Sequence, residues 1–90
     1  TIVVSIGDVT DPKVLTASIQ DLAANHNILR IKGFVHVPGK SMRHVVQAVG
    51  GRVQHYFDRE WQDGETRESR LVVIGQTGFD HEAVTASLQQ

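Results

Sequence analysis

Short runs rich in Val and Ile, each bounded by turn residues, divide this chain of 90 residues into strand-sized pieces. β-Branched side chains favour extended backbone, and 13 of the residues are Val. We therefore expect four strands, at Thr1–Val9, Ile28–Val37, Arg43–Phe57 and Ser69–Gln76. The longest uninterrupted apolar run has four residues, which is too short to span a membrane.

A first helix is expected after the opening strand. Asp11 and Pro12 form a typical helix start, because the carboxylate accepts free backbone N–H groups and Pro loses no hydrogen bond at the first helical position. The apolar face of this helix carries Leu15, Ile19, Leu22 and His26. The helix is expected to end near Asn25 or Asn27 and to lay that face on a sheet.

A second helix is expected at the end of the chain. Asp80 caps its start, with Phe79 before the cap and Val84 after it as a hydrophobic staple. The order of elements is then β-α-β-β-β-α. We predict an α+β fold in which two helices cover one face of a four-stranded, mainly antiparallel sheet.

The run Ile28–Val37 alternates between two faces, as a strand does. The face expected to point at the core carries Leu29, Ile31, Val35 and Val37. The opposite face carries Arg30, Lys32, Phe34 and His36. Gly33 lies between them, where the strand can bend or admit a close neighbour.

Two adjacent glycines, Gly50 and Gly51, interrupt the run Arg43–Phe57. They could close a hairpin between two strands, or they could form a bulge that bends one long strand. The sequence pattern does not decide between these two structures. We favour the bulge, which leaves the sheet with four strands.

Charge is unevenly distributed, although the formal net charge is only −1. No acidic residue occurs from Leu22 to Phe57, whereas five occur from Asp58 to Glu68. This separation predicts a fold with one positive side and one negative loop. The candidates for a partner-contacting surface are Arg30, Lys32, Arg43 and Arg52.

Trp61 is the only Trp and lies in the middle of the acidic loop. Its ring could anchor the loop by closing over the edge of the sheet. It could also contact a partner, since Trp is enriched where binding energy concentrates. Trp61 is therefore kept among the candidate partner-binding residues.

No pattern in the chain indicates a catalytic centre or a cofactor site. Gly33–Ser41 ends in Gly-Lys-Ser like a phosphate-binding loop, but five residues separate its glycines where four are needed. No helix pattern follows Ser41, so we expect a turn there. The chain has no Cys, which excludes thiolate metal ligands and cysteine nucleophiles and suits a reducing cytoplasm.

Metal binding is an alternative function for this chain. His36, His44 and His55 could act as auxiliary ligands if neighbouring strands align them, because neutral imidazole is a common metal ligand. None of the histidines forms a tightly spaced pair typical of a metal site. The three are weak candidates, and surface or partly buried strand histidines are the ordinary interpretation.

A third hypothesis is the binding of single-stranded nucleic acid. Lys32–Val37 partly matches an RNA-recognition signature, with Phe34 as the stacking aromatic. The second aromatic of that signature is missing, and the overall charge is balanced. A nucleic-acid partner is therefore not expected.

Several segments, in order, resemble the CobW C-terminal domain, which follows the GTPase domain in the CobW family of P-loop GTPases and metal chaperones. They are Ile28–Val35, Val46–Val53, Asp58–Trp61 and Ser69–Gly75. The resemblance covers residues 25–90. It implies that residues 1–90 form a single domain and are a fragment of a longer GTPase.

The resemblance further implies a cytoplasmic parent protein whose N-terminal domain binds GTP and a divalent metal, cobalt or zinc. CobW itself is linked to cobalt supply for cobalamin synthesis. The family's nucleotide-binding loop and Cys-x-Cys-Cys motif belong to that other domain, and neither occurs in this chain. We therefore expect a noncatalytic accessory domain that contacts the N-terminal GTPase domain of the same chain or a client metalloprotein.

Overall fold

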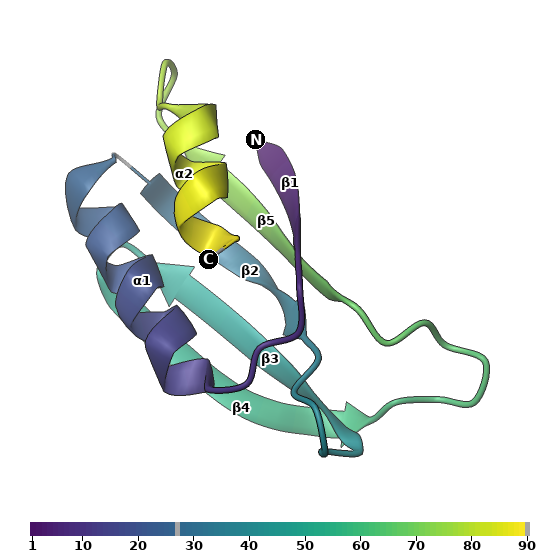
Figure 1. The fold of residues 1–90 in the computed structure, drawn as a ribbon. Helices are drawn as coiled ribbons and strands as arrows, with labels where there is room; N and C mark the ends of the chain where they lie inside the picture. Colours follow the sequence, from purple (N-terminus) through teal and green to yellow (C-terminus); the bar gives the residue numbers. More distant parts are fainter. Residues whose placement is uncertain (27, 90) are drawn as a thin grey trace.

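The computed structural model describes residues 1–26 and 28–89 and shows an antiparallel sheet covered by two helices (Figure 1). The elements are β1 (Ile2–Ile6), α1 (Pro12–Asn25), β2 (Ile28–Val35), β3 (Met42–Val49), β4 (Arg52–Glu60), β5 (Ser69–Gly75) and α2 (His81–Leu88). The strands lie in the order β1-β5-β2-β3-β4, and each neighbouring pair is antiparallel. The predicted α+β class is confirmed.

Both helices lie on the same side of the sheet, while the described residues place no helix on the other side (Figure 1). α1 packs on β2, β3 and β4, and α2 packs on β1 and against α1. The two-layer arrangement buries an apolar core between helices and sheet. Neither described helix is long and apolar enough to cross a membrane.

The prediction of four strands is wrong, because Gly50 and Gly51 close a hairpin rather than form a bulge. Val49 and Arg52 are directly paired across the turn, and β3 and β4 continue as antiparallel neighbours. Gly50 has a φ of +59°, which a Gly adopts at little cost and which two-residue hairpin turns require. The order of elements is therefore β-α-β-β-β-β-α.

The predicted helix starts are confirmed. Asp11 accepts a hydrogen bond from the backbone N–H of Lys13 at 3.0 Å, and Pro12 occupies the first turn. Asp80 accepts one from the backbone N–H of Ala83, also at 3.0 Å. These side chains satisfy N–H groups that have no partner within their own helices.

The predicted inward face of α1 is also confirmed at Leu15, Ile19 and Leu22, which are buried in the core. α1 ends at Asn25, as expected, and the alternative end at Asn27 lies outside the described residues. Val84 of the second helix belongs to the same apolar cluster, and Phe79 before the helix packs against it.

Strand β2 departs from its predicted alternation at one residue. Ile31 and Val35 face the core as expected, but Leu29 is 49% exposed, and Ile28 takes the inward place. The pairing of β2 with β5 shifts register between Ile28 and Arg30, which a simple alternation does not anticipate. The close neighbour expected at Gly33 is confirmed, because a Cβ there would lie 2.1 Å from the carbonyl oxygen of Arg70.

Candidate functional site

The side of the sheet that faces away from the helices carries most of the predicted partner-binding residues. We call this surface the open face, and the strand pairing aligns its residues in rows across the sheet. Its members are Val3, Ser5, Arg30, Lys32, Phe34, Arg43, Val45, Gln47, Val49, Arg52, Gln54, Tyr56, Arg70, Val72 and Ile74.

Three of the predicted residues, Arg30, Lys32 and Arg52, form a cluster on the open face that we call the basic patch. Arg30 pairs with Val49, which pairs in turn with Arg52, and Lys32 lies two residues along β2 from Arg30. All three side chains are exposed, and none forms an ion pair within the described part of the chain. The patch therefore carries three positive charges that no ion pair among the described residues neutralises.

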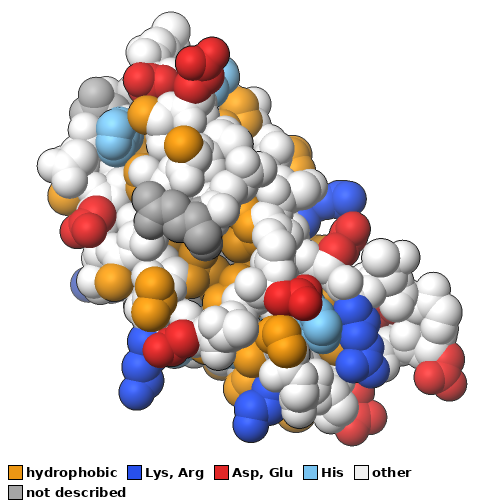
Figure 2. Space-filling view, in the orientation of Figure 1, with side chains coloured by type: hydrophobic (Ala, Val, Ile, Leu, Met, Phe, Trp, Pro, Cys, Tyr) orange, Lys and Arg blue, Asp and Glu red, His pale blue; other side chains and the backbone are white. Residues whose placement is uncertain are grey.

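Exposed apolar side chains lie beside the basic patch. Val49 between the two arginines is 59% exposed, and Ile74 and Val72 on β5 are also exposed. The helix-covered side has a different character, since Figure 2 shows acidic and basic side chains interspersed around the hydrophobic ones there. A surface that combines free cations with exposed apolar side chains is suited to contact a partner.

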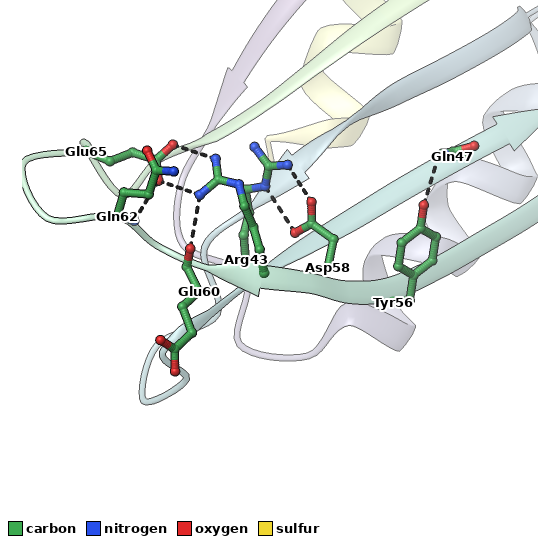
Figure 3. A network of polar contacts seen from close by, with 8 residues as sticks. Arg43, Gln47, Tyr56, Asp58, Glu60, Gln62 and Glu65 are labelled. Carbon is green, nitrogen blue, oxygen red and sulfur yellow. Dashed lines mark hydrogen bonds and ion pairs between the residues drawn. The ribbon is translucent and has the colours of Figure 1, made fainter.

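Arg43 lies on the same face but has partners within the chain. Its guanidinium makes a two-pronged contact with the carboxylate of Asp58, with Nε donating to Oδ1 at 3.2 Å (Figure 3). The guanidinium also lies 5.0 Å from the centre of the Phe34 ring. The hydrogen bond from Arg43 lowers the pKa of the Asp58 carboxyl, so that the pair stays charged at neutral pH.

A bulge between β3 and β4 places Asp58 in this position. The pairing runs from His44 with Phe57 to Arg43 with Arg59, so Asp58 is the extra residue on β4. Such a bulge bends the strand and redirects the side chain of the inserted residue. Here it sets the Asp58 carboxylate against Arg43.

A second ion pair fixes the loop after β4. Arg59 donates to the two carboxylate oxygens of Glu65 at 2.9 and 2.8 Å, and the backbone N–H of Gln62 donates to the same carboxylate (Figure 3). The Arg59 hydrogen bonds lower the pKa of Glu65 to about 2. The acidic loop is therefore held by Arg59, an arginine of the preceding strand β4.

Trp61 is packed inside the chain and is only 6% exposed. Its ring meets those of Phe34 and His36 edge-on, with centroids 5.8 and 6.0 Å away, and its backbone N–H donates to the Ser41 carbonyl. This placement agrees with the loop-anchor interpretation, and direct contact of Trp61 with a partner stays a prediction. Nucleic-acid stacking on Phe34 loses support, because Trp61 and Arg43 already pack against that ring.

The structure brings together two of the three candidate metal ligands. His44 Nε2 and His55 Nδ1 lie 3.0 Å apart on the helix-facing side of β3 and β4. His36 lies on the other side of the sheet, where its Nδ1 is 2.9 Å from the Asp8 carboxylate. Within residues 1–26 and 28–89, no three His, Asp or Glu side chains converge as a metal site would require.

His44 is the more buried of the pair, with 4% of its surface exposed. Its Nδ1 has no hydrogen-bond partner among the described residues, and its ring meets the Phe57 ring edge-on, with the centroids 4.6 Å apart. Burial, followed by the nearby His55, lowers the pKa of His44. Its imidazole is therefore neutral at physiological pH, the state in which it can accept a proton or bind a metal.

Sequence reasoning missed the internal partners of the candidate residues. The sequence pattern places Asp58 and Glu65 only in a negative loop, and it gives no sign that the Tyr56 hydroxyl accepts a hydrogen bond from Gln47 at 3.2 Å. The pairing of Arg43 with Asp58 depends on the β3–β4 hairpin, which the bulge hypothesis excluded. The two adjacent glycines are the signal in the sequence: a hairpin there aligns the two strands and brings Arg43 near Asp58.

Comparison with known proteins places the whole chain in one family. Residues 1–90 match the family described as the cobalamin synthesis protein cobW C-terminal domain. Two curated proteins named zinc chaperone CobW, from a Sinorhizobium species and from Pseudomonas aeruginosa, are 46% and 45% identical to it over 86 residues. These matches cover 96% of this chain but only 24% and 22% of the relatives, so the chain spans about a quarter of their length.

Solved structures show the same fold. A zinc-bound triple mutant of the YjiA GTPase superimposes with a TM-score of 0.73 at 26% identity, over 99% of this chain and 29% of that protein. The zinc-bound YjiA GTPase from E. coli gives a TM-score of 0.70 at 23% identity, over 96% of this chain and 27% of the other. The sheet and helices described above therefore recur as one part of larger proteins.

Proposed function

This chain belongs to the family of cobW C-terminal domains, and from that premise we propose that it is a noncatalytic accessory domain of a longer GTP-dependent metal chaperone. Two similar proteins are named zinc chaperones, and a structural neighbour is a GTPase. We propose that GTP and a divalent metal bind elsewhere in the parent, which acts in the cytoplasm. Zinc is the cargo that the relatives' names favour over cobalt.

The observation that carries this proposal is the basic patch. Arg30, Lys32 and Arg52 lie close together on the open face, and none of them forms an ion pair with a carboxylate of the described residues. A partner that supplies acidic groups pairs with these charges and steers its own approach. The exposed Val49 and Ile74 supply apolar contact area beside the charges.

We assign the patch first to the GTPase domain of the same chain and second to a client metalloprotein. The domain acts through a difference between nucleotide states. A contact made in one state and released in the other shifts the equilibrium only by the difference in contact free energy. The patch then senses whether GTP or GDP is bound.

Arg43 and Trp61 have a different role in this proposal. Their side chains are held by Asp58, Phe34 and His36, so they shape the end of the open face rather than reach out from it. Loss of either side chain should alter partner binding through the shape of the loop at residues 61–68.

Hydrogen exchange on the full-length protein, compared in GTP and GDP, tests the proposal. We expect the amides of β2 and of the first half of β4 to exchange more slowly in one nucleotide state. Replacing Arg30 and Arg52 together by Glu should abolish this difference. Arg67→Glu is a matched control, because Arg67 is exposed on the loop and has no ion pair within the described residues.

Equal exchange of these amides in both nucleotide states would contradict the accessory role. If the difference in exchange between nucleotide states persists in the double Glu variant, the accessory role stands but the contact is made by another surface of the domain. If the difference appears only when a client metalloprotein is added, the client rather than the GTPase domain is the partner.

A further inference from the structure

The pair of histidines between β3 and β4 has no part in the proposed partner contact. His44 and His55 lie on the helix-facing side of the sheet, opposite the basic patch. The facing nitrogens, His44 Nε2 and His55 Nδ1, are 3.0 Å apart. The pair therefore needs an explanation of its own.

The separation of these nitrogens is close to the bite of two ligands on one metal ion. A zinc–nitrogen bond of about 2.0–2.1 Å and a tetrahedral angle place two ligand nitrogens about 3.3 Å apart. We propose that His44 Nε2 and His55 Nδ1 together bind one divalent transition-metal ion of the zinc class, with water in the remaining positions. This inference does not rest on the accessory role.

The fold holds both rings in place before any ion arrives. His44 is directly paired with Phe57, and His55 with Val46, so the two histidines are diagonal neighbours on adjacent strands. The His44 imidazole is fixed by its burial and by its edge-on contact with the Phe57 ring. His55 is exposed, so an ion can reach the pair from solvent.

Metal binding only moves a proton within the pair. In the absence of metal, one proton lies between the two facing nitrogens and makes their hydrogen bond. When an ion takes both lone pairs, His55 can carry its proton on Nε2, where water reaches the exposed ring. His44 then carries its proton on the buried Nδ1, which has no acceptor among the described residues, so both imidazoles stay neutral at a cost that weakens the affinity for the ion.

The composition of the site predicts that the ion binds with low affinity and exchanges readily. No third His, Asp or Glu of the described residues joins the pair, so this part of the protein supplies only two ligands. Imidazole favours zinc, copper, nickel and cobalt over magnesium and calcium. Such a site can accept a metal and pass it on, because the remaining positions stay open to water or to a donor from another molecule.

Residue-resolved labelling of histidines with diethyl pyrocarbonate, in the full-length protein with and without zinc chloride, tests the site. The reagent attacks an imidazole lone pair, and zinc on Nδ1 leaves His55 with only a protonated Nε2. Zinc at ten times the dissociation constant should therefore reduce His55 labelling about tenfold. His81, which is also exposed, serves as the control and should label equally in both conditions.

Two variants make the result specific. His44→Gln should abolish the protection of His55 by zinc, because a single imidazole binds far more weakly than two. His55→Gln changes an exposed position, so it should leave the fold intact and remove one bound zinc per molecule in equilibrium dialysis, whereas His81→Gln should remove none. Protection that persists in His44→Gln, or its absence at about 1 mM zinc, would overturn the proposal.

Discussion

The two ends of the open face contain similar residues and treat them in opposite ways. At one end, the arginines and lysine of the basic patch are exposed and unpaired within the described residues. At the other end, Arg43 and Arg59 are held by Asp58 and Glu65, and Trp61 is buried beside them. The difference shows that the role of an arginine depends on whether the fold brings a carboxylate to it.

The largest effect should come from removing the packed aromatic at the held end. Trp61→Ala should lower the free energy of unfolding by about 3–5 kcal/mol, because it leaves a cavity next to Phe34 and His36. Native-state hydrogen exchange of β2 and β5 amides measures this loss. Tyr56→Ala removes an exposed aromatic from the same face and should cost less than about 1 kcal/mol.

Breaking one ion pair of the held end should have a smaller effect. Arg43→Ala removes the contact with Asp58 and the stacking on Phe34, and we expect a loss of about 1 kcal/mol that shrinks at high salt. The same exchange measurement, repeated at two salt concentrations, checks it. Arg67 lies in the loop and has no ion pair within the described residues, so Arg67→Ala should change the free energy of unfolding by less than half as much as Arg43→Ala. Equal losses for the two variants would remove the contrast between held and free arginines.

Low pH should destabilise the end of the open face that contains Asp58 and Glu65, and it should leave the basic patch unaffected. Glu65 has a pKa of about 2 in the folded chain against an ordinary 4.5, so the folded state binds fewer protons than the unfolded state between these values. The contribution of Glu65 is fully present above about pH 4.5 and is lost as the pH falls towards 2. The pKa of Asp58 is lowered in the same direction.

Carbon-13 NMR titration of the carboxyl groups measures this behaviour directly. The midpoint of Glu65 should lie near 2, and Arg59→Gln should return it towards 4.5. A wild-type midpoint already near 4.5 would show that Arg59 does not hold the loop in solution.

The smallest effect on stability should come from the basic patch. Arg30→Gln together with Arg52→Gln should change the free energy of unfolding by less than about 0.5 kcal/mol, because neither side chain has a partner within the described residues. Exchange of core amides again measures it. A loss comparable with that of Arg43→Ala would mean that the patch has a structural role.

Local features of the chain were predictable from sequence because they depend on neighbouring residues. The caps at Asp11 and Asp80 and the buried face of α1 each follow from a few consecutive side chains. The close approach at Gly33 was also foreseen, since a strand glycine often marks one. These features give the α+β class and the covered face of the sheet.

Features that depend on register were not predictable in the same way. The number of strands depends on the conformation of Gly50, and the exposure of Leu29 depends on an irregular pairing of β2 with β5. The contact of His44 with His55 needs the β3–β4 alignment, which no local pattern encodes. The candidate cations were found from charge distribution, but their division into free and held residues was not.

The bulge at Asp58 has a further consequence for how this protein behaves in a crowded solution. β4 is one of the two edge strands of the sheet, and its outer backbone edge is a template on which a strand of another molecule could add. A bulge twists such an edge out of flatness, and charged side chains at Asp58, Arg59 and Glu60 discourage stacking there. The residue that secures Arg43 is thus also expected to disfavour edge-to-edge pairing through β4.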